Sequence, residues 1–256
     1  MSNVMSTHIF RRVLKFGAFC ASMGLPVGLL AQTAVTLEVG SWPPYIDFAS
    51  RHNGVLTQTV QSAFRSAGTE TKLRETSWKA AENQIDHGQA ISFGWIKNPE
   101  RTARWLFSDP VCDASTVLVV RKSHPPVWSK LEQLGSYRLG WSRGYSYGET
   151  IDRLRPNLQV TEMVNDEVAL RRLADGSVDA VPMDPLVAKE LIRKLFSTQE
   201  AQHLLIDTAP HHVIARTSLH LVCSMAAGHC KSTIALFNLG LKQHYKQGAV
   251  PMCGDQ

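Results

Sequence analysis

Arg101 is the residue of this chain whose type and setting point most directly to binding chemistry. It follows a Lys-Asn-Pro-Glu turn, and six residues later Phe107 begins the sequence Phe-Ser-Asp-Pro, whose turn formers are typical of a chain leaving one domain for another. A guanidinium group can hold both oxygens of a carboxylate through parallel N–H bonds. The alternative is a surface arginine paired with Glu100 or Asp109, which would contribute at most about 1 kcal/mol.

Ser146 and Asp184 stand where helices are predicted to begin. Glu149 follows Ser146 by three residues, as in a capping box, and Pro185 follows Asp184 directly, which suits the first position of a helix. Both side chains are therefore expected to act as N-caps. Because a helix start also has free N–H groups, an anion site at Ser146 is compatible with capping.

Strands and helices alternate along the chain, which predicts an α/β fold built from βαβ units. Trp78 lies on the apolar face of a predicted helix, where a core position is favoured over a solute site. The strands are expected at residues 35–40, 71–75, 114–121, 137–141, 158–160, 204–206, 213–218 and 219–224. The helices are expected at residues 56–67, from 78 to before Gly88, at 166–174, after Asp184 and from about 231 to 246, with a helix or turn at 128–134.

Residues 1–31 have the pattern of a signal peptide, with Arg11, Arg12 and Lys15, no acidic residue, and a following apolar run. That run is shorter than the roughly 20 residues that a membrane-spanning helix needs. We expect cleavage after Ala31 and export of a soluble protein to the periplasm. Export by the twin-arginine route is an alternative, and Cys20 is assigned to ordinary signal sequence rather than to a lipoprotein site.

Four cysteines remain after this cut, and an even number in an oxidising compartment predicts disulfides. Cys223 and Cys230 flank a short loop and form the first predicted pair, which leaves Cys112 and Cys253 as the second. His220 and His229 lie close enough to Cys223 and Cys230 to suggest zinc as an alternative, although this cysteine spacing is uncommon in zinc fingers. We predict no metal and no cofactor.

The predicted mature chain is close to neutral, with 24 Lys and Arg against 22 Asp and Glu. No basic run interleaved with aromatic residues argues for a nucleic-acid partner. The sequence also contains no Gly-x-Ser-x-Gly, His-Glu-x-x-His or phosphate-binding glycine loop. The sequence therefore gives no support to the usual nucleophile, metalloprotease or nucleotide-hydrolase functions.

The order of the motifs resembles the extracellular solute-binding proteins of family 3, the polar amino-acid receptors of ABC importers. In that family a T-x-E-R segment is followed closely by F-S-D/E-P-Y. Arg101 and its spacing to Phe107 match, whereas Asn98 replaces the threonine and Val111 the tyrosine. The resemblance runs from about residue 36 to 248 and implies a two-lobed periplasmic-binding-protein fold of type II. Each lobe would be a central sheet flanked by helices, and two hinge strands would join them. The implied boundaries are residues 32–112 and 217–256 for lobe 1, and 113–216 for lobe 2.

The resemblance also implies a cleft site. Arg101 and the helix start at Ser146 would hold a solute carboxylate, and Asp184 matches the acid that binds an ammonium group. Trp42 and Tyr45, in a Trp-Pro-Pro-Tyr segment, would cover the apolar part of the solute. The alternative is that this segment only packs on the lobe surface.

Tyr145 and Trp95 are further candidates for an aromatic pocket. The family carries a hydroxyl-rich stretch where this chain has Phe93, Gly94 and Trp95. Trp95 therefore either forms an aromatic wall of the pocket or fills the lobe. This departure from the family leaves the solute unnamed.

By resemblance, the protein would be a monomeric receptor that closes around a small polar solute, an amino acid or related carboxylate. Its partner would be an ABC permease or a membrane sensor. A periplasmic cyclohexadienyl dehydratase uses the same fold and is an alternative, and its aromatic-like substrate would suit a pocket of aromatic residues. That pocket would contain Trp42, Tyr45, Trp95, Tyr145 and Tyr147. A ligand-sensing domain that acts on a separate membrane kinase is another alternative.

Overall fold

The computed structural model describes residues 1–2, 34–245 and 250–254. The predicted signal peptide, Cys20 and the cleavage site after Ala31 therefore lie almost entirely outside the described residues. Within the described part of the chain, no helix is long and apolar enough to cross a membrane.

The strands form one connected path in the order β2-β1-β3-β10-β5-β8-β6-β7, with β4 paired to β10 and β9 paired to β5. Their bounds are β1 Val35–Val39, β2 Thr71–Glu75, β3 Ile91–Trp95, β4 Trp105–Phe107, β5 Cys112–Arg121, β6 Arg138–Ser142, β7 Gln159–Met163, β8 Ala180–Met183, β9 Leu204–Asp207 and β10 Ala215–Ser224.

The helices alternate with these strands as the sequence predicts. Their bounds are α1 Val55–Ser66, α2 Trp78–Asp86, α3 Pro99–Thr102, α4 Glu149–Leu154, α5 Asp166–Ala174, α6 Pro185–Leu195, α7 Thr198–Ala201 and α8 Cys230–Tyr245, with 3₁₀ turns at Leu131–Ser136, Arg155–Asn157 and Pro210–His212.

The first lobe is built around β1, which pairs in parallel with β2 and β3, while β10 runs antiparallel to β3 and β4. Helices α1 and α8 pack closely on each other, and the rings of Phe64 and Phe237 lie 5.0 Å apart. A Cβ atom on Gly240 would lie only 1.9 Å from the Ala63 carbonyl oxygen. Glycine is therefore required where these two helices meet.

The second lobe is built around β6, which pairs in parallel with β7 and β8. Strands β8 and β9 in turn run antiparallel to β5. Trp141, Leu139 and Leu134 are almost fully buried in its core. Burial of these apolar side chains stabilises the second lobe.

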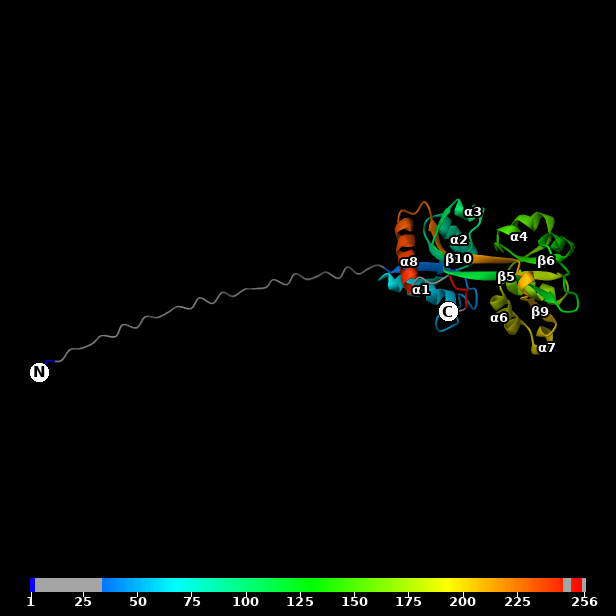
Figure 1. The fold of residues 1–256 in the computed structure, drawn as a ribbon, viewed down its shortest axis with the longest axis horizontal. Helices are drawn as coiled ribbons and strands as arrows, with labels where there is room; N and C mark the ends of the chain where they lie inside the picture. Colours follow the sequence, from blue (N-terminus) through cyan, green and yellow to red (C-terminus); the bar gives the residue numbers. More distant parts are fainter. Residues whose placement is uncertain (3–33, 246–249, 255–256) are drawn as a thin grey trace. The chain divides into compact units, whose positions relative to one another are not determined.

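Two strands link the lobes. The first half of β5, residues 112–116, pairs with residues 215–219 of β10, and the remainder of each strand joins a different lobe sheet. Figure 1 shows β5 and β10 passing between the group that contains α1, α2 and α8 and the group that contains α4, α6 and α7. These are the two hinge strands expected from the resemblance, whereas the residue boundaries of the lobes stay a prediction.

The elements that were predicted agree with the structure to within a few residues at their ends, whereas β3, β4, α3 and α7 were not predicted. The strands expected at 213–218 and 219–224 form the single strand β10. Its first half pairs with β5 and its second half with β3, and the backbone stays extended between them. The strand expected at 158–160 extends to Met163, where it pairs with Ser142 of β6. Helix α5 has the predicted bounds, and Gly176 follows its end with φ +83°.

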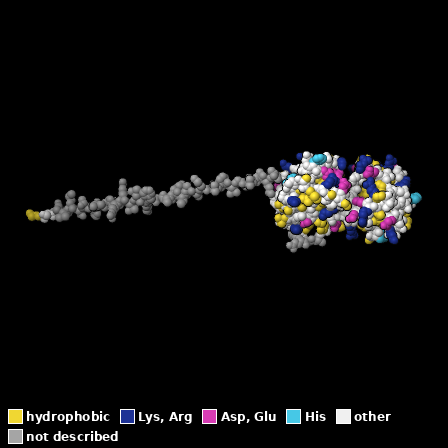
Figure 2. Space-filling model, turned by 90° about the horizontal axis from the view of Figure 1, so that it is seen from above, with side chains coloured by type: hydrophobic (Ala, Val, Ile, Leu, Met, Phe, Trp, Pro, Cys, Tyr) yellow, Lys and Arg dark blue, Asp and Glu magenta, His cyan; other side chains and the backbone are white. Residues whose placement is uncertain are grey.

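Both predicted disulfides are present, Cys112–Cys253 and Cys223–Cys230. Because Cys223 and Cys230 are bonded to each other, neither sulfur is available as a thiolate ligand, which contradicts the zinc alternative. On the face seen in Figure 2, acidic and basic side chains are interspersed, as expected from the small net charge of the predicted mature chain.

Candidate functional site

Helix α3 positions Arg101. The Asn98 side chain accepts a hydrogen bond from the Arg101 backbone N–H at 2.8 Å, and Pro99 occupies the first helical position. Asn98 thus serves as the N-cap of a four-residue helix. Asparagine is at least as favourable an N-cap as the threonine that the family has at this position. The short helix directs the Arg101 side chain away from solvent.

The Arg101 guanidinium is buried and contacts both lobes. Only 8% of the residue is exposed. Nη1 donates to the Ile96 carbonyl oxygen and Nη2 to the Gly144 carbonyl oxygen, both at 3.2 Å. Ile96 follows β3 in the first lobe, and Gly144 follows β6 in the second. Arg101 therefore connects the segment that follows β3 to the loop that follows β6.

The surface-arginine alternative is wrong. Glu100 pairs with Arg104 instead, at 3.3 Å, and Asp109 lies 3.8 Å from Lys242. Burial lowers the pKa of Arg101 below its usual value, because desolvation disfavours the charged form. A buried cation held by neutral carbonyls would gain from an anion brought into contact with it.

Trp95 fills the first lobe and also forms a wall for Arg101. It is 5% exposed, and its Nε1 donates to the Ser92 hydroxyl at 2.8 Å. The Arg101 Cζ atom lies 4.8 Å from the Trp95 ring centroid, within the range of a cation–π contact. The position of Trp95 is therefore compatible with both predicted roles, filling the core of the lobe and forming an aromatic wall of the pocket.

Trp78 and Trp105 support this arrangement. The ring of Trp95 makes edge-on contacts with Trp78 at 5.2 Å and with Trp105 at 5.0 Å. Trp105 also lies 5.9 Å from the Arg101 Cζ atom. Trp78 is half-buried against the core, in agreement with its predicted packing role.

A second contact across the cleft joins Tyr45 to Asp184. The Tyr45 hydroxyl donates to Asp184 Oδ1 at 3.0 Å, and both residues are buried. Trp42 packs on Tyr45 with ring centroids 4.7 Å apart. The segment that carries Trp42 and Tyr45 therefore reaches the second lobe and does not simply cover the surface of the first.

Asp184 is the N-cap of α6, as its position before Pro185 predicts. Its Oδ1 accepts from the backbone N–H groups of Leu186 and Val187 at 2.8 and 3.2 Å. Burial raises the pKa of Asp184 above its usual value, although these bonds and that from Tyr45 act in the opposite direction. The described bonds all converge on one carboxylate oxygen, which leaves Oδ2 as a possible acceptor for a solute.

Ser146 is not the N-cap of the following helix, so the predicted capping box is wrong. Helix α4 begins at Glu149 with Gly148 as its N-cap. The Ser146 hydroxyl instead donates to the carboxylate of Asp152, which also accepts from the Tyr147 backbone N–H. The chain needs the positive φ of Gly148, +111°, to enter the helix, and sequence spacing alone does not show this.

Tyr145 packs against the hydrophobic core of the second lobe, of which it is part. Its ring stacks on Tyr147 at 5.7 Å, and burial together with the Asp166 carboxylate raises the pKa of Tyr145 well above its usual value. Asp166 itself accepts a short hydrogen bond from the Ser142 hydroxyl. Tyr145 and Ser146 thus belong to the loop whose Gly144 carbonyl meets Arg101, and their contact with a solute stays a prediction.

The structure adds groups to the site that the sequence analysis missed. The carbonyl groups of Ile96 and Gly144 orient Arg101, and Trp105 lies behind its guanidinium. Main-chain acceptors have no side-chain signature, so no sequence pattern could have identified them. Trp105 could have been suspected from its position between Arg101 and Phe107.

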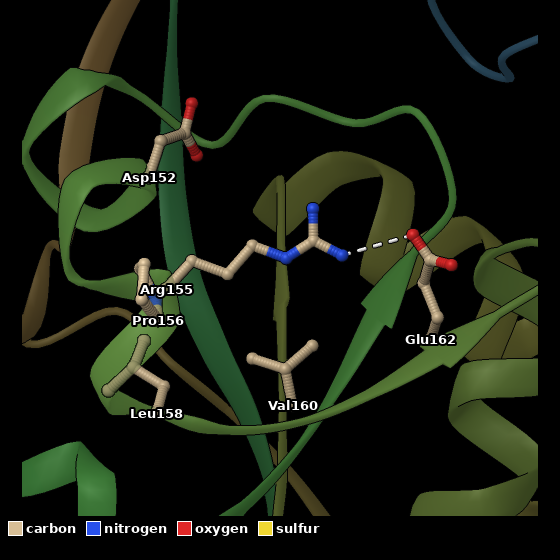
Figure 3. A pocket seen from close by; sticks show the side chains of 6 residues that line it. All are labelled: Asp152, Arg155, Pro156, Leu158, Val160 and Glu162. Atoms are coloured by element: carbon tan, nitrogen blue, oxygen red, sulfur yellow. Dashed lines mark hydrogen bonds and ion pairs between the residues drawn. The ribbon is translucent and has the colours of Figure 1, made fainter.

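A surface depression of about 510 Å³ lies elsewhere on the second lobe (Figure 3). An ion pair between Arg155 and Glu162, 3.0 Å long, crosses it. None of the predicted solute-binding residues lines this depression, and it is not assigned to the cleft. Its lining residues are Asp152, Arg155, Pro156, Leu158, Val160 and Glu162.

Two sheets, two hinge strands and a buried arginine between the lobes define a periplasmic-binding-protein fold. Solved structures with this fold are similar to the chain. They include a histidine kinase sensor domain with similarity to periplasmic binding proteins, at TM-score 0.70 and 18% identity, which covers 85% of this chain and 92% of that one. Another is ArtJ of Geobacillus stearothermophilus, which binds arginine, lysine and histidine, at TM-score 0.67 and 19% identity, with 84% and 91% covered.

In sequence, the chain is similar to amino-acid-binding proteins of this class. The L-cystine-binding protein TcyJ of Escherichia coli K12 is 23% identical over 164 residues, which are 62% of this chain. The match spans 61% of that relative's own length. No family model matches the chain. The sequence relative and the shared fold agree with the resemblance to solute-binding proteins of family 3.

Proposed function

We propose that this protein captures a small polar solute, an amino acid or related carboxylate, by closing its two lobes around it. The observation that carries the proposal is the buried Arg101, whose guanidinium contacts both lobes and is held by carbonyls rather than by a carboxylate. A solute carboxylate would add a direct charge partner to the more distant carboxylates of Glu82, Glu100 and Asp152, which already favour the charged form of Arg101. Its contacts to both lobes would favour the closed arrangement over the open one.

The other candidate residues have distinct roles in this proposal. Asp184 would accept from a solute ammonium group through the oxygen that Tyr45 and the α6 backbone leave free. Trp42 and Tyr45 would cover the apolar part of the solute. Trp95 would pack against the Arg101 guanidinium that binds the solute carboxylate. The loop of Tyr145 and Ser146 would move with Gly144 and add donors to the anion only after closure.

The proposed lobes are residues 32–112 with 217–256, and residues 113–216. The protein would be exported to the periplasm, cleaved after Ala31, and would act as a monomer without catalysis. Intact-mass measurement of periplasmic material tests the cut, since a mass that retains residues 1–31 contradicts it. The partner would be an ABC permease, as for transport receptors of this fold.

A thermal-shift screen of purified protein against amino acids, small carboxylates and amines tests the function. A solute that binds only the folded state raises the melting temperature. Calorimetry with a hit should give one solute per protein molecule. The absence of any hit, together with turnover of prephenate or arogenate, would replace this proposal with the dehydratase alternative.

A second candidate function is solute sensing for a separate membrane kinase. It is favoured by the similarity to a histidine kinase sensor domain at TM-score 0.70. Sensing and transport require the same closure, so binding alone does not separate them. Co-purification of the solute-loaded protein with a permease, or with a kinase, distinguishes the two roles.

A further inference from the structure

The C-terminal residues 250–254 are attached to the start of a hinge strand. The Asp113 N–H donates to the Pro251 carbonyl oxygen at 2.9 Å, and the Cys253 N–H donates to the Asp113 carbonyl oxygen at 2.8 Å. The Cys112–Cys253 disulfide fixes the same point covalently. Two backbone hydrogen bonds and one covalent bond thus anchor this segment to β5, at the point where β5 pairs with β10.

The same segment reaches the second lobe. A Cβ atom on Gly254 would lie 2.6 Å from Leu186 Cδ1, so the backbone of Gly254 packs directly against that side chain. Leu186 is in the first turn of α6, and its N–H donates to Asp184 at 2.8 Å. The segment therefore extends from the hinge to the helix that Asp184 caps.

We propose that residues 250–254 form a tether that restrains opening of the lobes, with the Cys112–Cys253 disulfide as its anchor. An opening motion about β5 and β10 would carry α6 away from the anchored segment and separate Leu186 from Gly254. The contact consequently belongs to the arrangement in which Tyr45 reaches Asp184. A contact made in one arrangement and lost in the other shifts the equilibrium toward the first.

The second disulfide provides a contrast within the same chain. Cys223–Cys230 joins the end of β10 to the start of α8, both in the first lobe. It restrains a local loop and should have no effect on lobe opening. Both disulfides are buried. If residues 250–254 restrain the lobes, loss of Cys112–Cys253 should favour opening, whereas loss of Cys223–Cys230 should not.

The test is a Gly254→Ala substitution, studied without any solute. The new methyl group would overlap Leu186 Cδ1, so the contact between Gly254 and Leu186 must rearrange while the disulfide stays intact. Gly254 has φ +102°, so strain in the left-handed region must be controlled separately. Gly68→Ala is the matched control, because Gly68 has φ +76° but no atom within 4 Å of a Cβ at that position.

Small-angle X-ray scattering and hydrogen exchange give the readouts. We expect Gly254→Ala to increase the radius of gyration and to accelerate exchange of the Leu186 and Val187 amides about fivefold or more, and Gly68→Ala to change neither. A Cys112→Ser/Cys253→Ser double variant should show the same changes, and Cys223→Ser/Cys230→Ser should not. Equal behaviour of Gly254→Ala and wild type overturns the tether, as does equal expansion of Gly254→Ala and Gly68→Ala. Because no solute is used, these outcomes do not depend on the proposed solute.

Discussion

The hydroxyl of Tyr45 donates a hydrogen bond to Asp184 Oδ1 across 3.0 Å, although 139 positions separate the two residues in the chain. Tyr45 lies in the loop after β1, and Asp184 caps α6. The bond therefore joins the first lobe to the second at the place where a solute ammonium group is proposed to bind.

Tyr45→Phe tests whether this bond stabilises the closed arrangement. Loss of one hydrogen bond to a charged acceptor should cost about 1.5 to 3 kcal/mol of closing free energy. Scattering should show a larger radius of gyration than in wild type. Tyr137→Phe is the control, because among the described residues the Tyr137 hydroxyl bonds to the backbone of Val127, within the second lobe. Equal radii for wild type and Tyr45→Phe would contradict this role.

Arg101→Ala should weaken binding of an identified carboxylate solute by about 2 to 5 kcal/mol, because the buried charge pair is lost. Arg101→Lys should restore only part of the affinity, since an ammonium group cannot reproduce the fork of a guanidinium. Titration calorimetry on folded variants gives both values. Arg104→Ala serves as control, because Arg104 also lies near Trp105 but pairs with Asp86 rather than across the cleft. Wild-type affinity in a folded Arg101→Ala variant would exclude the proposed clamp.

Asp184→Asn should selectively weaken solutes that bear an ammonium group. Asparagine still caps a helix, so the fold should be retained. The pKa of Asp184 is raised by burial, so acidification should remove its charge at a higher pH than for an exposed aspartate. Affinity of wild type for an ammonium-bearing solute should fall on acidification, and that of Asp184→Asn should change less. Parallel pH profiles would contradict the assignment.

The two disulfides should contribute unequally to stability. The chain-entropy relation gives about 2.5 kcal/mol for the short loop closed by Cys223–Cys230 and about 5 kcal/mol for the long loop closed by Cys112–Cys253. Urea unfolding of Cys223→Ser/Cys230→Ser and of Cys112→Ser/Cys253→Ser measures the difference. Non-reducing peptide mapping checks the pairing itself. A larger loss for the short-loop variant would show that local strain or packing outweighs loop closure.

Asp179 should make the second lobe sensitive to acid. Hydrogen bonds from Arg138 lower the pKa of Asp179 to about 2, below the value of about 3.9 expected in an unfolded chain. The stabilisation is therefore present above about pH 4 and is lost as the pH falls toward 2. Asp179→Asn should cost about 1 to 2 kcal/mol at pH 7 and little at pH 2. Denaturation at both pH values checks this, and an equal loss at each would exclude the charge as the cause.

The sequence by itself determined most of the longer elements, the two disulfide pairs and the class of fold. Hydrophobic periodicity and flanking glycines located α1 and α5 closely, because these signals act over a few residues. Asp184 before Pro185 identified the start of α6 for the same reason. Arg101 stood out because its turn and its distance from Phe107 match a family pattern.

Only the tertiary structure decided how these residues act on one another. The pairing of Tyr45 with Asp184, the carbonyls that hold Arg101 and the position of the C-terminal segment on α6 all join distant parts of the chain. Main-chain groups carry no side-chain signal, and contacts between lobes depend on how two sheets meet at the hinge. Ser146 shows the limit most directly, since its local pattern favoured a cap, whereas the positive φ of Gly148 moved the helix start and left its hydroxyl to Asp152.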